Sequence, residues 1–206
     1  PISNIDEDDH DLEIQRFSAI RLFRNKKSLR YQGRIHEALH CSDGELQLLI
    51  ENERLLILHT GYSSQRILGK IHRNMALLQA DIAENGEQLQ HYRYLMDCYF
   101  GLKDYKKTLH YALLAIDAPI IAVGSQSDLY HCALESMRQL KYPKEEMLAF
   151  VKKAIQAFPD LPDYYAEQGI VLSSMGFLDQ ARNSLEKAIA LFEDAAITQK
   201  EASYFA

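Results

Sequence analysis

The sequence predicts a mainly α-helical protein of repeated antiparallel helix pairs, preceded by a small β-rich segment. From about residue 66 the apolar residues recur every three or four positions, which is typical of helices with one buried face. Glycines and prolines fall in or near the joints between these runs. Residues 16–60 instead contain short extended runs separated by polar turns. We therefore expect two parts, residues 1–64 and residues 65–206.

Composition and charge narrow the class of protein. The 206 residues are 47% hydrophobic and 25% charged, which is typical of a globular protein with a core. The formal net charge of -6 at pH 7 argues against nucleic acid as a partner. No apolar run approaches the ~20 residues of a membrane span. Three widely spaced cysteines, Cys41, Cys98 and Cys132, predict a reduced, cytoplasmic chain without a disulfide framework or zinc site.

Eight helical segments are expected after residue 65. They cover about 66–84, 88–101, 104–117, 126–140, 144–158, 162–175, 178–192 and 195–204. The middle six form three pairs. The first segment is a leading helix, and the last is expected to cap the stack with a polar outer face.

Three stretches of the helical part share one frame. Residues 92–116 align without a gap with residues 165–189, and residues 131–155 fit the same frame. An alanine recurs at one position, as Ala115, Ala154 and Ala188, where a small side chain lets paired helices approach closely. The pattern resembles the tetratricopeptide (TPR) repeat, whose period is 34 residues. The best match is the third unit, with Tyr165, Gly169, Leu172, Gly176, Ala181, Leu185 and Ala188. The resemblance implies a right-handed superhelix; an unrelated bundle of helical hairpins is the alternative.

A TPR stack forms a concave groove from the first helix of each pair. The resemblance implies that a protein, a peptide or a glycan acceptor binds there, and a homodimer is also possible. The expected groove residues are Gln90, Arg93, Asp97, Phe100, Cys132, Ser136, Gln139, Ala166, Ile170 and Ser173. The Lys and Asn of carboxylate-clamp TPRs are absent from these places, so we reject a binder of chaperone tails. Arg93 and Asp97 lie one turn apart, and the alternative is that they pair with each other.

The front third has an uneven charge pattern. Residues 6–13 hold six acids, and residues 14–36 hold seven Arg or Lys and no acid. Extended runs are expected within 16–25, 29–36 and 45–62. The letters "DED" (6–8) and "DHD" (9–11) match an Asp-x-Asp metal-binding pattern. We interpret them as a solvated loop, because they follow no apolar strand.

Three ordered motifs in this part carry a second resemblance. They are "IRLFRN" (20–25), "YQGRIHEAL" (31–39) and "ILHTGYSS" (57–64), followed by the TPR-like helices. Over about residues 17–64 they resemble the end of the catalytic domain of bacterial family 2 glycosyltransferases, of GT-A type. The chain would then be the C-terminal region of a nucleotide-sugar-dependent transferase, and its start at Pro1 would fit a fragment. The alternative is a stand-alone TPR scaffold without catalysis.

The glycosyltransferase resemblance also implies site residues, which would act only together with a nucleotide-binding half. His36 would face a divalent cation, Mn²⁺ or Mg²⁺, or the sugar diphosphate. The implied substrate contacts are Arg21, Arg24, Arg34 and Glu37. For this chain alone we expect no catalytic residue and no cofactor. The alternatives are a hydrogen-bonded structural histidine and arginines that project into solvent.

Overall fold

The computed structural model describes residues 2–6, 12–17, 20, 22–34, 38–46, 55–59, 64–118 and 126–198. The chain divides into two compact units, Pro1–Gln88 and Leu89–Ala206. The division therefore falls after the first long helix, whereas the sequence-based boundary at 64/65 falls at its start.

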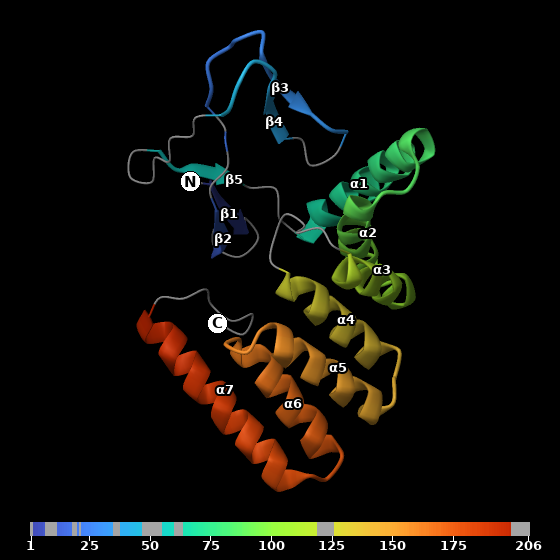
Figure 1. Ribbon diagram of the computed structural model, residues 1–206, viewed down its shortest axis with the longest axis vertical. Helices are drawn as coiled ribbons and strands as arrows, with labels where there is room; N and C mark the ends of the chain where they lie inside the picture. Colours follow the sequence, from blue (N-terminus) through green and yellow to red (C-terminus); the bar gives the residue numbers. More distant parts are fainter. Residues whose placement is uncertain are drawn as a thin grey trace. The chain divides into compact units, whose positions relative to one another are not determined.

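Short strands and one long helix form the first unit (Figure 1). β1 (Ile2–Asp6) lies at the centre of a three-stranded sheet, antiparallel to β2 (Leu12–Phe17) and parallel to β5 (Ile57–His59). β3 (Leu29–Gln32) and β4 (Ala38–Cys41) form a separate antiparallel pair. The long helix is α1 (Ser64–Asn85).

β1 is buried on both faces, from Ile2 to Ile5. Its polar side chains have partners, as buried polar groups require. Ser3 donates a hydrogen bond of 2.5 Å to Glu13 Oε2, and Asn4 Oδ1 lies 3.0 Å from His59 Nδ1. The strand is thus held by β2 on one side and by β5 on the other.

The strand predictions for the front third are correct only in part. β1 was not predicted, because Ile-Ser-Asn-Ile-Asp lacks the alternation of a half-buried strand, and its partner β5 is distant in sequence. The acidic run was expected to be a loop, but Asp6 ends β1 and Leu12 begins β2. Residues 7–11 lie outside the described residues. In the run expected within 16–25, Arg16 and Phe17 belong to β2, and residues 22–25 are exposed and not part of a strand.

Six helices follow in the second unit. They are α2 (Leu89–Gly101), α3 (Tyr105–Asp117), α4 (Ser127–Gln139), α5 (Lys144–Ala157), α6 (Pro162–Ser174) and α7 (Leu178–Thr198). Each helix packs on the next, and α2 also contacts α4. Figure 1 shows α4 to α7 side by side as successive layers. The three predicted pairs, α2/α3, α4/α5 and α6/α7, are confirmed.

Local signals explain where these helices begin and end. The Asp104 carboxylate accepts a hydrogen bond of 3.2 Å from the Lys107 amide and so caps the start of α3. Pro162 occupies the first turn of α6, where a missing N–H costs nothing. Gly176 follows α6 with a φ of +86°, a conformation in which glycine carries no steric penalty.

The separate capping helix predicted over 195–204 is wrong. α7 continues without a break from Leu178 to Thr198. No glycine or proline lies between these residues, so nothing in the local sequence ends the helix at 192. Residues 199–206 lie outside the described residues.

The core of the second unit is continuous through the three pairs. Met96, Leu129, Val151 and Tyr164 are buried in one cluster that draws on α2, α4, α5 and α6. The three recurring alanines are also buried, which agrees with close packing of the helices at those positions. Among the described residues, no helix is both long enough and apolar enough to cross a membrane.

Candidate functional site

The predicted groove residues lie on α2, α4 and α6, the first helices of the three pairs. In the shared repeat frame, Asp97 and Ile170 occupy one position, while Gln139 and Ser173 occupy another. The Asp97 side chain is 49% exposed, and Ile170 is 52% exposed. Gln90, Gln139 and Ser173 are exposed as well. We call these five residues the first-helix face.

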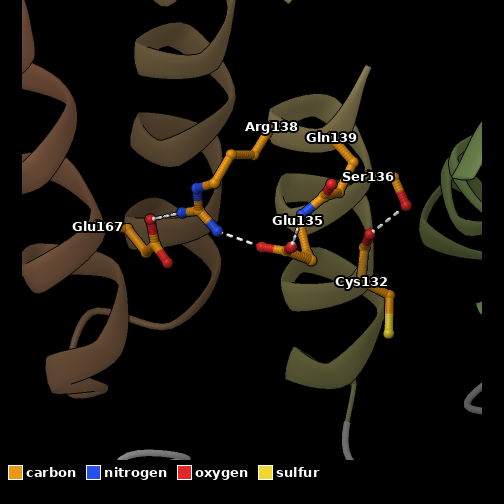
Figure 2. Close-up of polar contacts among 6 residues, drawn as sticks. All are labelled: Cys132, Glu135, Ser136, Arg138, Gln139 and Glu167. Atoms are coloured by element: carbon orange, nitrogen blue, oxygen red, sulfur yellow. Dashed lines mark hydrogen bonds and ion pairs between the residues drawn. The ribbon is translucent and has the colours of Figure 1, made fainter. Parts of the chain in front are cut away.

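Two other predicted groove residues, Ser136 and Phe100, are buried or half-buried. Ser136 is fully buried, and its hydroxyl donates a hydrogen bond of 2.7 Å to the Cys132 carbonyl, as Figure 2 shows. Phe100 is half-buried against the core cluster. Ser136 belongs to the same repeat position as Asp97 and Ile170, so the repeat frame alone does not determine which side chains stay open.

Arg93 links the first pair to the second. Its side chain is only 9% exposed, and its guanidinium lies 2.6 Å from an Asp128 oxygen of α4. The same guanidinium lies 3.3 Å from Asp97, one turn further along α2. The predicted pairing of Arg93 with Asp97 is therefore present, and a second carboxylate completes the arrangement.

Arg138 links the second pair to the third in the same way (Figure 2). Its guanidinium forms ion pairs with Glu135 on α4 and with Glu167 on α6. Gln139 donates a hydrogen bond of 2.7 Å to Glu135. This link was not predicted from the sequence, because Arg138 and Glu167 are distant in the chain. Only the Glu135–Arg138 spacing of one helical turn was visible beforehand.

The Asp97 carboxylate lies in a poorly solvated place although half of its side chain is accessible. Loss of water around it raises the pKa of Asp97, and the nearby Arg93 opposes this rise. Four carboxylates here share two guanidinium groups, those of Arg93 and Arg138. The surface is therefore acidic.

Of the residues implied by the glycosyltransferase resemblance, only Arg24 and Arg34 lie within the described residues. Arg24 is exposed in the stretch after β2. Arg34 forms an ion pair with Glu84, near the end of α1. Arg21, His36 and Glu37 lie outside the described residues.

Within the part of the chain that the structure describes, no group of three His, Cys, Asp or Glu side chains could hold a metal ion. The cysteines are all free. Burial raises the pKa of Cys98 to about 11 and that of Cys132 to about 12. Both thiols therefore stay protonated at neutral pH and are poor nucleophiles or ligands.

Comparison with known proteins shows the fold. No family model matches the chain, and no curated protein is similar to it. A crystal structure of MamA, a protein of TPR-like helical repeats, is similar with a TM-score of 0.54 and 16% identity; the match covers 63% of this chain and 73% of that one. The structure "MamA AMB-1 P212121" gives a TM-score of 0.51 and 18% identity, over 65% and 71%.

At this identity the similarity shows the fold and nothing more. The chain has a TPR-like helical repeat fold with a small strand segment before it. These comparisons give no support to the glycosyltransferase resemblance.

Proposed function

We propose that this protein is an interaction scaffold whose TPR-like array binds a segment of another protein along the first-helix face. One observation carries the proposal. Asp97 and Ile170 recur at one repeat position on α2 and α6, and both stay accessible while the helices around them are packed. Repeat arrays present such rows of side chains as extended binding surfaces.

The side chains also indicate the chemistry of the partner. The guanidinium groups of Arg93 and Arg138 already form ion pairs with carboxylates of this chain. They would therefore bind a carboxylate of the partner only weakly. A lysine or arginine side chain of the partner would be attracted electrostatically to the acidic surface around Asp97. Ile170 offers an apolar contact. The expected ligand is therefore a peptide with both a basic and an apolar side chain.

Selection from a displayed peptide library, followed by fluorescence anisotropy, tests this proposal. We expect basic-apolar peptides to be enriched, and Ile170→Arg to weaken their binding by roughly tenfold or more. Asp97→Asn should weaken binding less and reduce its dependence on salt. Lys152→Glu is the matched control, because Lys152 is exposed on α5, a second helix. No enrichment, or an equal loss in the control, would remove the first-helix face as the binding site.

The glycosyltransferase reading remains a second candidate, supported by the three ordered sequence motifs of residues 17–64. In that case the TPR-like array would serve acceptor or protein binding, and His36 would lie near a divalent cation, Mn²⁺ or Mg²⁺. Because His36 and Glu37 lie outside the described residues, no metal geometry follows from the fold. In a full-length transferase, His36→Ala should lower turnover by roughly tenfold or more without unfolding the protein. Unchanged turnover would exclude His36 from the site.

A further inference from the structure

An apolar stripe of α7 borders the side that packs on α6, and its Leu185 side chain also lies against Gly169 of α6. Leu178, Leu185, Ile189 and Phe192 are between 39% and 66% exposed. Their spacings of seven, four and three residues place them on one side of the helix. Among the described residues, α6 is the only helix or strand that α7 contacts. We call this stripe the end face.

The end face corresponds to the surface on which one helix pair packs against the next. In the repeat frame, Leu185 corresponds to Val151 of α5 and to Ala112 of α3, which are both fully buried. Phe192 corresponds to Phe158, which packs against the core cluster. α3 and α5 are covered at these positions because α4 and α6 pack on them. α7 has the same kind of side chains without a following pair in the described chain.

We propose that a second copy of this chain covers the end face, with the α7 helices of the two copies packed antiparallel about a twofold axis. The surface is then shared equally, as a twofold interface requires. Leu185, Ile189 and Phe192 are suited to helix-on-helix packing, because their equivalents in α5, Val151, Ile155 and Phe158, already pack in the core of the array. The proposal is independent of the ligand of the first-helix face.

Charge placement favours the antiparallel arrangement. Arg182 and Glu193 are both exposed and border the stripe on the same side of α7. A twofold axis near residues 187 and 188 places Arg182 of one copy beside Glu193 of the other, twice per dimer. The same register places Leu185 beside Ile189 of the second copy. In a parallel arrangement about a twofold axis, Arg182 and Glu193 of the two copies would lie on opposite sides of the interface, so this pair could not form.

Sedimentation of the intact chain over a range of concentrations tests the proposal. We expect a monomer–dimer equilibrium, and a dimer of Leu185→Asp weakened roughly a hundredfold or more, with unchanged helical circular dichroism. Leu113→Asp is the matched control, because Leu113 is an exposed leucine of α3, and it should leave the dimer intact. Arg182→Glu and Glu193→Arg should each weaken the dimer, and the two changes together should restore it.

Two results would overturn the proposal. A wild-type chain that stays monomeric at high concentration would show that no second copy covers the end face. If that monomer dimerises only after residues 199–206 are removed, the chain's own C-terminal residues cover the stripe instead. A dimer that survives Leu185→Asp and both charge reversals would place the contact elsewhere. The charge variants keep the test valid even if Leu185→Asp fails to fold.

Discussion

The middle pair, α4/α5, and the last pair, α6/α7, have the same repeat frame but different surroundings. Val151 of the middle pair is fully buried, while Leu185, at the same position of the last pair, is partly exposed. The middle pair is joined to neighbours on both sides, through Arg93–Asp128 and Arg138–Glu167. A repeat position therefore supplies a suitable side chain, and the neighbouring helix determines whether that side chain is buried.

The largest expected effect comes from a charge placed at this shared position. Val151→Asp should lower the free energy of unfolding by more than about 4 kcal/mol, because it buries a carboxylate without a partner. Leu185→Asp should cost the monomer less, about 1 to 2 kcal/mol, because it removes a contact with Gly169 of α6 but the new carboxylate reaches solvent. Urea denaturation of both variants measures the difference. Equal losses would contradict the view that the surroundings separate the two positions.

A smaller effect is expected from the contact that joins the last pair to the middle pair. The buried Tyr164 hydroxyl of α6 donates a hydrogen bond of 2.7 Å to the Ser127 carbonyl of α4. Tyr164→Phe removes the donor and leaves that carbonyl without it, at a cost of about 1 to 3 kcal/mol. Tyr142→Phe, at an exposed tyrosine, should change stability by less than about 0.5 kcal/mol. Indistinguishable melting curves would show that this hydrogen bond does not stabilise the joint.

The smallest expected effect is a difference in thiol reactivity between a buried cysteine of the middle pair and a cysteine introduced on α7 of the last pair. Cys132 of the middle pair should resist iodoacetamide in the native protein, because burial raises its pKa to about 12. A cysteine introduced as Leu185→Cys should react readily under the same conditions. Above pH 9 the unfolded chain loses the Cys132 proton first, so stability should fall as the pH rises toward 12. Rapid native labelling of Cys132 would contradict its burial.

Much of the helical part could be predicted because its signals are local. Helix-breaking residues such as Gly176 and Pro162 mark the joints, and Asp104 marks the start of α3. β1 could not be predicted, since its strand pairing with β5 joins residues far apart in the chain. The sequence also cannot tell which members of one repeat position are exposed. Asp97 and Ile170 are exposed, whereas Ser136, at the same repeat position, is buried.

The helix pairs, their joints and the small alanines between paired helices could be predicted from local sequence signals, because each depends on residues within one or two turns or on a repeated spacing. Only the tertiary structure decided which equivalent positions are covered, which arginine bridges which pair, and where an apolar stripe stays open. Burial and ion pairing of this kind depend on residues from different helices, such as Arg138 of α4 and Glu167 of α6. No local sequence pattern predicts that two such residues lie close together.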